Sequence, residues 1–175
     1  NCPVTTTWSL AYAALRTVLG PGIPNCAGYQ RNITMTAPLG SIVNPRPYAA
    51  CAARGVIAYR MLDAYFSAFG KLMPGLVPAG GEGGPTASSF SGRRADRDAH
   101  WLVTDGILGS GGGREKLDGV EGISNPGANI SNQPIELMEA RLPMMVEEYA
   151  YARNSGGAGR TRGGQAMVRR YRVLA

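Results

Sequence analysis

The spacing of apolar positions predicts two amphipathic helices. In the first, apolar residues recur every three or four positions at Trp8, Tyr12, Leu15 and Leu19. Thr5 or Thr6 is placed to cap its start, and the Gly-Pro pair at 20–21 is placed to end it. In the second, between residues 52 and 72, the same spacing links Leu62, Tyr65, Phe69 and Leu72. We therefore expect two helices, each with one apolar face.

Extended structure is predicted where β-branched residues cluster or where apolar and polar residues alternate. The run "NITMTAP", Asn32 to Pro38, favours a strand, followed by a short extended piece with Ile42 and Val43. A further extended run spans His100 to Leu108. The polar, glycine-rich stretch from Pro78 to His100 predicts loops with at most short strands.

The C-terminal third predicts a short helix and a pair of strands. Pro134 stands at a helix-start position with Glu136 in the first turn. The segments "PMMVEEYAYA" and "QAMVRRYRVL" alternate as half-buried strands do, and they flank the stretch "SGGAGRTRGG", Ser155 to Gly164. An antiparallel pair is expected there, and the chain as a whole is assigned to the α+β class as one domain, residues 1–175.

Composition narrows the classes of protein. The 175 residues are 44% hydrophobic, and no apolar run approaches the roughly 20 residues that cross a bilayer. Three cysteines without a CxxC pair and a single histidine, His100, provide no ordinary zinc ligand set. We expect no metal site within the chain, no membrane association, and a cytoplasmic location, because an odd cysteine count suits a reducing compartment.

The charge pattern gives little support for nucleic acid as a partner. The net charge is +6, and one of two basic groups lies between Arg153 and Arg172. No aromatic-rich binding motif accompanies these arginines, so nucleic-acid binding is not predicted. The chain opens without an initiator Met or a targeting pattern and enters a helix within a few residues. It is expected to be a fragment of a longer polypeptide.

The glycine stretch from Ser155 to Gly164 has two interpretations. Glycines together with Arg160 and Arg162 are typical of an anion site, since exposed N–H groups and guanidinium groups bind phosphate. The stretch lacks the GxxxxGK[ST] spacing of a P-loop, however, and a strand follows it instead of a helix. The alternative is a turn between strands, in which the glycines adopt positive φ angles.

Single residues elsewhere offer less. Asp105 ends an extended run beside a glycine loop, where substrate sites often form, and is the candidate catalytic residue; a solvated or turn-capping aspartate is the alternative. His100 lacks an identifiable paired acid and is expected on the surface. Cys51 is expected in the core as a small hydrophobe. Glu136 and Glu139 give no specific sign of catalysis.

The last third of the sequence resembles the hydantoinase B/oxoprolinase family. Residues 129–174 carry its successive patterns N-x-P-[IV]-E-x-x-E, P-x-x-V-x-x-Y and S-G-G-x-G-x-x-R-G-G. The first 50 residues, with "PGIPNCAGYQRNITMTAPLGSIVNPRP", resemble an upstream segment of the same family. Asp105 stands where the resemblance leads us to expect a glutamate, which would suit a divergent substrate.

The resemblance implies a place in an ATP-dependent enzyme. In this family a hydantoinase A-like partner subunit handles ATP with magnesium, and a divalent metal cluster lies toward the N-terminal half of the B-type subunit. The chain is thus expected to be the C-terminal portion of a B-type subunit, without a cofactor of its own. Arg160 and Arg162 would face the partner or a phosphorylated intermediate, and are the candidate cofactor-binding residues.

Three functions follow from the resemblance. The first is hydrolysis of a small cyclic amide, of hydantoin or 5-oxoproline type, by a complex in which the fragment alone is inactive. The second is a related ATP-dependent carboxylation of a ketone. The third is a non-catalytic element that holds the rest of the B-type subunit against its A-type partner.

Overall fold

The computed structural model describes residues 1–84, 86–94 and 98–174. Helices come first along the chain: α1 (Val4–Val18), α2 (Ala27–Gln30) and α3 (Arg54–Leu72). An antiparallel hairpin follows, formed by β1 (Thr86–Arg94) and β2 (Ala99–Ile107). The chain ends with α4 (Ile135–Arg141) and a second antiparallel hairpin, β3 (Met144–Tyr151) and β4 (Met167–Val173). The α+β assignment is confirmed.

The core of the helical arm lies between α1 and α3. Its buried members are apolar residues from both helices: Leu10, Ala14, Ala58, Leu62 and Phe66. Tyr65, Phe69 and Val77 pack against them, so the predicted apolar face of α3 is the buried one. In α1, by contrast, Trp8 lies outside this core, because 41% of its surface is exposed.

The predicted cap of α1 is wrong. The helix begins at Val4 directly after Pro3, and its first turn has no side-chain cap. The nearby hydroxyl that forms a long-range bond is that of Thr7, which donates to the Val43 carbonyl at 2.7 Å. The helix start is therefore fixed by tertiary contact with the segment around residue 43, not by a capping threonine.

The predicted strand from Asn32 to Pro38 is also wrong. This stretch is irregular, and the expected extended piece at Ile42 and Val43 is a turn closed by an isolated bridge between Ser41 and Asn44. A strand requires a partner for its backbone groups, and among the described residues no neighbouring strand offers one. β-branched composition alone did not specify a sheet.

The expectation of only short strands between Pro78 and His100 is wrong as well. β1 covers nine residues and pairs in register with β2, with Phe90 opposite Val103. The remainder of that stretch includes residues 85 and 95–97, which lie outside the described part of the chain. The extended run at 100–108, the helix after Pro134 and the C-terminal strand pair are all confirmed.

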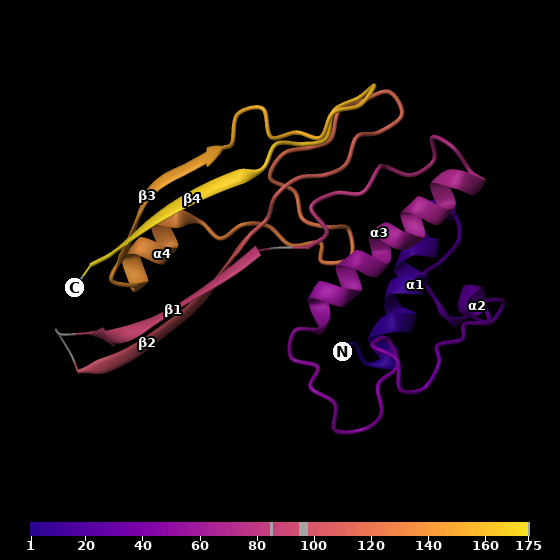
Figure 1. Cartoon of the computed structure of the whole chain (residues 1–175), viewed down its shortest axis with the longest axis horizontal. Coiled ribbons are helices and arrows are strands. Elements are labelled where there is room, and N and C mark those ends of the chain that lie inside the picture. Colours follow the sequence, from indigo (N-terminus) through magenta and orange to yellow (C-terminus); the bar gives the residue numbers. More distant parts are fainter. Residues whose placement is uncertain (85, 95–97, 175) are drawn as a thin grey trace.

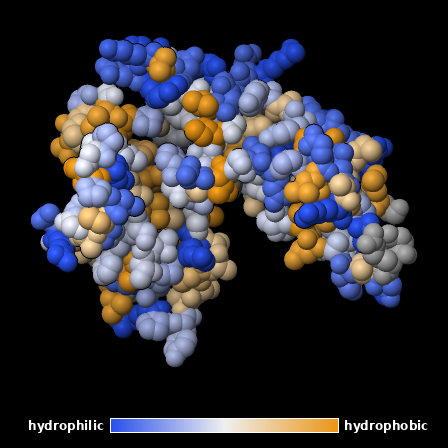
Figure 2. All heavy atoms as spheres, turned by 180° about the vertical axis from the view of Figure 1, so that it is seen from behind, coloured by the Kyte–Doolittle hydropathy of each residue, from blue (hydrophilic) through white to orange (hydrophobic). Residues whose placement is uncertain are grey.

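Two arms diverge from a junction of loops (Figure 1). The helical arm holds α1 to α3, and the other arm holds both hairpins, with α4 packed on β3. The view from behind shows a deep notch between the arms (Figure 2). Among the described helices, none combines the length and apolar character needed to span a bilayer.

Candidate functional site

Three glycine-rich segments meet at the junction of the arms. They are residues 78–82 after α3, residues 109–113 after β2, and residues 155–164 between β3 and β4. Backbone hydrogen bonds join them: Ala79 N–H to the Gly113 carbonyl at 2.9 Å, Glu82 N–H to the Ser110 carbonyl at 3.1 Å, and Gly164 N–H to the Gly111 carbonyl at 2.9 Å. We call the space between these segments and α3 the glycine cleft.

The glycine cleft consists of two adjoining hollows. The helix-side hollow, about 180 Å³, is lined by Asp63 and Phe66 of α3, by Glu82 and Ser110, and by Asn125, among others. The glycine-side hollow, about 370 Å³, is lined by all three glycine-rich segments. Its walls are therefore largely backbone, which leaves peptide groups accessible along them.

The glycines of the cleft permit close backbone contact. A side chain on Gly112 would overlap the Ala79 carbonyl, and one on Gly164 would overlap the Val120 carbonyl. The prediction of positive φ angles in the stretch from Ser155 to Gly164 is wrong, because none of its glycines adopts one. The residue with positive φ is the preceding Asn154, at 57°. Tight packing between segments, not a left-handed turn, explains Gly164.

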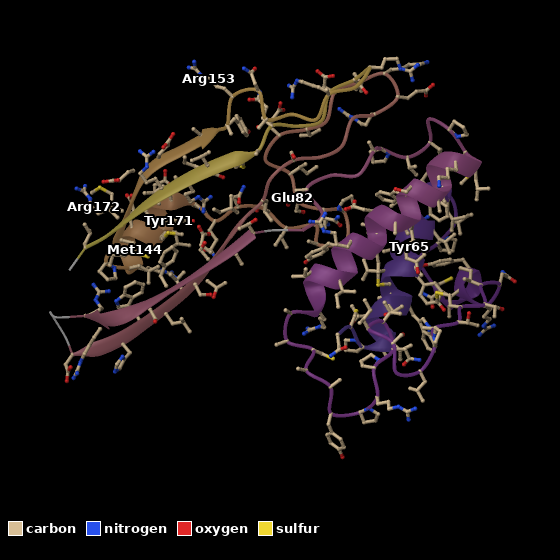
Figure 3. All side chains as sticks on the ribbon, in the orientation of Figure 1. Tyr65, Glu82, Met144, Arg153, Tyr171 and Arg172 are labelled. Carbon is tan, nitrogen blue, oxygen red and sulfur yellow. The ribbon has the colours of Figure 1, made fainter. Side chains whose placement is uncertain are left out.

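Two carboxylates and one guanidinium meet where the segment after α3 enters the cleft. Asp63 and Arg60 lie on α3, and Asp63 accepts the backbone N–H of Gly81. Glu82 accepts the backbone N–H of Gly109. Burial raises the pKa of both carboxyl groups, while these hydrogen bonds and the charge of Arg60 partly oppose the rise. Figure 3 labels Glu82 at the junction between the two arms.

One oxygen of Glu82 has no hydrogen-bond partner among the residues with described positions. Its Oε1 is buried and accepts no hydrogen bond from the residues that the structure describes. Asn125 is 6% exposed; its Oδ1 accepts the Gly127 N–H at 2.9 Å, while its Nδ2 donates to none of the described residues. The unsatisfied oxygen of Glu82 is thus shielded from solvent, beside a hollow whose wall includes Asn125.

The two candidate arginines of the glycine stretch differ sharply. Arg162 forms ion pairs with Asp118 at 3.3 Å and with Glu121 at 2.6 Å, and it donates to the Gly163 carbonyl. This arginine also lowers the pKa of Glu121. Arg160 is exposed and has no hydrogen-bond or ion-pair partner within the described residues. Of these two arginines, Arg160 is the one that presents an uncommitted charge.

Asp105 lies elsewhere, within the hairpin arm. It is fully buried on β2, so the solvated or turn-capping interpretation is wrong. Its Oδ2 accepts hydrogen bonds from Arg169 and Tyr171 of β4. Arg169 also lies over the ring of Tyr149, 4.2 Å from its centroid. Asp105 therefore joins the two hairpins, and it lines neither hollow of the glycine cleft.

The titration behaviour of this buried group follows from its contacts. Burial alone would lower the pKa of Arg169, but the hydrogen bond to Asp105, the contact with Tyr149 and the charge of Asp105 raise it. Burial, reinforced by Asp105, raises the pKa of Tyr171 to about 12. The arginine stays charged and the tyrosine stays protonated near neutral pH, which is typical of a structural pair and not of a proton-transfer site.

Other candidates are dispersed. His100 is exposed on β2, as expected. Cys51 is half-buried, whereas Cys2 is fully buried. The prediction that Cys51 belongs to the core is therefore wrong. Among the described residues no three His, Cys, Asp or Glu side chains are grouped to hold a metal ion. The absence of a metal from the native protein stays a prediction.

Sequence reasoning missed Glu82, Asp63 and Asn125. Glu82 stands between glycine pairs in "AGGEGGP", and a lone carboxylate in such a setting was the available signal. Nothing in the sequence indicates that Asp63 of a helix and Asn125 of a distant loop would line the same hollow.

The fold has a counterpart in a larger enzyme. A solved structure of a nucleotide-free acetone carboxylase, which carries out ATP-dependent acetone carboxylation, matches 97% of this chain and 23% of its own, with a TM-score of 0.75. Sequence identity is 19%, so the likeness concerns the fold alone. The arms and their junction therefore correspond in fold to about a quarter of that carboxylase chain.

Sequence comparison defines the family. The family model described as hydantoinase B/oxoprolinase matches residues 1–175, and the chain belongs to this family. A Pseudomonas protein named as the B-type subunit of a "Putative D-/L-hydantoinase" is 32% identical over 100% of this chain and 30% of its own length. The 5-oxoprolinase PfmaA of Pestalotiopsis fici is 30% identical over 97% of this chain and 13% of its own.

A third relative extends the range of organisms. The 5-oxoprolinase of Dictyostelium discoideum is 29% identical over 99% of this chain and 13% of its own length. The chain thus spans less than a third of each of these relatives.

Proposed function

We propose that this chain is part of an ATP-dependent enzyme that hydrolyses a small cyclic amide of the hydantoin or 5-oxoproline type. The observation that carries the proposal is the family match over the whole chain, together with relatives named as a hydantoinase subunit and as 5-oxoprolinases. A cleft whose wall includes the desolvated carboxylate of Glu82 is consistent with a small polar substrate.

In this proposal ATP with magnesium is bound by a hydantoinase A-like partner subunit. The glycine stretch of this chain does not fit a nucleotide site of the P-loop type, because Arg162 is paired with carboxylates and the stretch runs into β4 instead of a helix. The divalent metal that the family resemblance implies does not fit either, since no ligand group exists among the described residues. Both are assigned to other parts of the complex.

A second candidate is ATP-dependent carboxylation of a ketone. The structural counterpart, an acetone carboxylase, is the observation that favours it. The third candidate is a role in assembly alone. It is compatible with the comparison, because the chain matches less than a third of the length of each relative.

The test uses the full-length polypeptide that carries this sequence, co-purified with its natural partner proteins. ATP hydrolysis would be measured with hydantoins, 5-oxoproline, or ketones plus bicarbonate, and the organic products would be identified by mass spectrometry. We expect cyclic amides to stimulate ATP hydrolysis and to be opened. Stimulation by ketones alone would replace the proposal with the second candidate, and no stimulation by any of these compounds would leave the assembly role.

The 175-residue chain by itself is expected to show no ATP turnover, since it carries no phosphate-binding lysine loop. Colorimetric phosphate release by the purified chain, compared with a buffer blank, checks this. Turnover that persists through repeated purification would contradict the division of labour between subunits.

A further inference from the structure

We propose that the loop between α2 and α3 docks on a separate protein subunit, with the ring of Tyr48 in an apolar pocket and Arg46 against the acidic rim of that pocket. Residues 37–50 are called the docking loop. The inference rests on the proposed function only for the existence of a partner subunit, and it is independent of the substrate.

The docking loop is tied to the rest of the helical arm on both sides of its tip. The backbone N–H of Cys2 donates to the Ile42 carbonyl at 2.7 Å, and the Thr7 hydroxyl donates to the next carbonyl along the loop. Beyond the tip, the side-chain amide of Asn1 donates to the Ala50 carbonyl at 3.2 Å. A loop held in this way is ordered before it binds, which lowers the entropic cost of association.

The tip of the docking loop presents an aromatic ring from a strained backbone position. Pro45 and Pro47 restrict the chain on the way to Tyr48, whose φ of 67° lies in a region that residues other than glycine seldom adopt. The Tyr48 side chain is fully exposed, and it has no ring contact or hydrogen bond with the residues that the structure describes. Strain of this kind is common at binding sites, and exposed tyrosines are frequent anchors of protein interfaces.

The docking loop also exposes apolar and basic side chains. Leu39 and Ile42 are 63% and 62% exposed. Arg46 is exposed as well, and it forms no ion pair with a described residue. The first 62 residues of the chain contain five arginines and no aspartate or glutamate. Since this part of the chain has no carboxylate to complement Arg46, a partner with an acidic surface is the complementary one.

A second copy of this chain does not provide such a surface. In a symmetric contact the docking loop would face itself, and its arginine would meet another arginine. On the hairpin arm, Asp98, Glu147 and Glu148 are already paired with arginines of the same arm.

Membranes and nucleic acids fit the docking loop less well than a protein does. Anionic membranes attract clusters of about four to eight basic residues, whereas Arg46 is the single basic residue between positions 37 and 50. A phosphate backbone would leave Leu39 and Ile42 in water. Tyrosine and arginine together with exposed aliphatic side chains are typical of the contact surface between two proteins.

The position of the docking loop allows this contact without closing the glycine cleft. The loop lies at the end of the helical arm that points away from the glycine-rich segments (Figure 1). None of its residues lines either hollow of the cleft. A subunit bound there would therefore leave the cleft accessible.

The experiment measures how tightly the full-length polypeptide that carries this chain binds its natural partner subunit. The co-purified complex is diluted stepwise at low and at high salt, and mass photometry gives the fraction that stays assembled. We expect Tyr48→Gly to weaken assembly about thirtyfold, as the loss of an interface anchor does. The unfolding temperature of the polypeptide without its partner should not fall, because glycine adopts a positive φ without strain. Tyr48→Phe keeps the ring and should assemble like the parent.

Charge variants test the acidic rim. Arg46→Glu should weaken assembly at least roughly tenfold at low salt and less at high salt, because it places a carboxylate against carboxylates. Arg31→Glu makes the same change at an exposed arginine outside the docking loop and should leave assembly unchanged.

Several results would overturn the inference. They are a Tyr48→Gly variant that assembles like the parent, a parent that forms only homo-oligomers or no complex, and equal effects of Arg46→Glu and Arg31→Glu. A lower unfolding temperature of Tyr48→Gly without the partner would show that the loop packs inside its own polypeptide. Binding of the parent to phosphatidylserine vesicles or duplex DNA that Tyr48→Gly abolishes would assign the loop to a membrane or to nucleic acid instead.

The outcome is distinguishable from that of the proposed function. If the complex opens cyclic amides with ATP while Tyr48→Gly assembles like the parent, the docking loop falls and the proposed function stands. If Tyr48→Gly disrupts assembly but no cyclic amide stimulates ATP hydrolysis, the docking loop stands and the proposed function falls.

Discussion

Asp105 shows how one residue can connect two elements that are otherwise separate. It lies on β2, and its hydrogen-bond partners Arg169 and Tyr171 lie on β4. The ring of Phe90 on β1 packs on Tyr171, with centroids 4.9 Å apart. The other oxygen of Asp105 and two nitrogens of Arg169 are buried without partners among the described residues. The buried charges of Asp105 and Arg169 therefore compensate each other, and each would be costly without the other.

We expect Asp105→Asn to destabilise the fold by about 3–5 kcal/mol, because the Arg169 charge would remain buried without its counter-ion. Urea unfolding followed by circular dichroism measures this. Asp98→Asn is the matched control: Asp98 pairs with Arg93 on the exposed end of the same hairpin, where an ion pair contributes little. Equal effects of the two variants would show that the buried pair is not a structural link.

Glu82 provides a pH-dependent test at the same scale. Its folded-state pKa is raised by burial, so the folded state holds the proton more tightly than the unfolded chain does. The resulting stabilisation is complete below the ordinary value of 4.5 and is lost as the pH rises through the raised value. Asp63 contributes in the same direction, and Arg60 opposes both.

Glu82→Gln carries no charge to desolvate at any pH. The free energy of unfolding of this variant, minus that of the parent, should therefore increase as the pH is raised from about 4 to about 7. Urea titrations at intermediate pH values measure the difference. A difference that is constant, or that decreases with pH, would mean that the Glu82 carboxylate is not desolvated in the folded protein.

At the scale of elements, local patterns sufficed where an element carries its own hydrogen bonds or has its partner nearby in sequence. The helix at 54–72 and the strands on either side of the glycine stretch were predictable from apolar spacing and alternation. The segment at 32–38 has equally strong β-branched composition but no strand to pair with among the described residues, and that depends on the whole fold.

For the candidate site too, the features of a single segment were predictable, whereas contacts between distant segments were not. The glycine stretch and its two arginines were visible in the sequence, but the pairing of Arg162 with Asp118 and Glu121 arises from a loop more than 40 residues away. The helix-side hollow is formed by residues from separated segments of the chain. A group of residues from separate segments leaves no repeating pattern in the sequence, so sequence analysis could not predict this hollow.

Glycine positions in the cleft test the close contact between segments. Gly112→Ala should destabilise the fold by about 1–3 kcal/mol. The added methyl group would overlap the backbone carbonyl of Ala79, and a backbone group cannot rotate out of the way as a flexible side chain can. Gly157→Ala is the control in the same cleft, since no described atom other than those of Gly157 and its two chain neighbours lies within 4 Å of the added Cβ. Thermal unfolding compares them. Similar losses in both variants would indicate that chain flexibility, not contact, explains these glycines.

At the scale of the whole molecule, the glycine cleft lies where the helical arm and the hairpin arm join (Figure 3). Large apolar side chains stay exposed on both arms, including Leu72 at 76% and Leu102 at 73%. The relatives of the chain are more than three times its length. Arg160 lies in the glycine stretch at this junction, in a loop whose other arginine is already paired.

Arg160→Ala is therefore expected to separate folding from assembly. The parent and the variant should unfold at the same temperature, since Arg160 is exposed and makes no contact with the described residues that depends on its charge. If Arg160 faces the A-type partner or a phosphorylated intermediate, the variant should co-purify with that partner less well or turn over substrate more slowly, by several-fold at low salt.

Two further variants decide how that result is interpreted. Arg31→Ala removes the same charge from an exposed position beside α2 and should change neither stability nor assembly. Arg162→Ala should lower the unfolding temperature instead, because it leaves Asp118 and Glu121 without their cation. Assembly and turnover of Arg160→Ala equal to those of the parent would make the loop a structural connection alone.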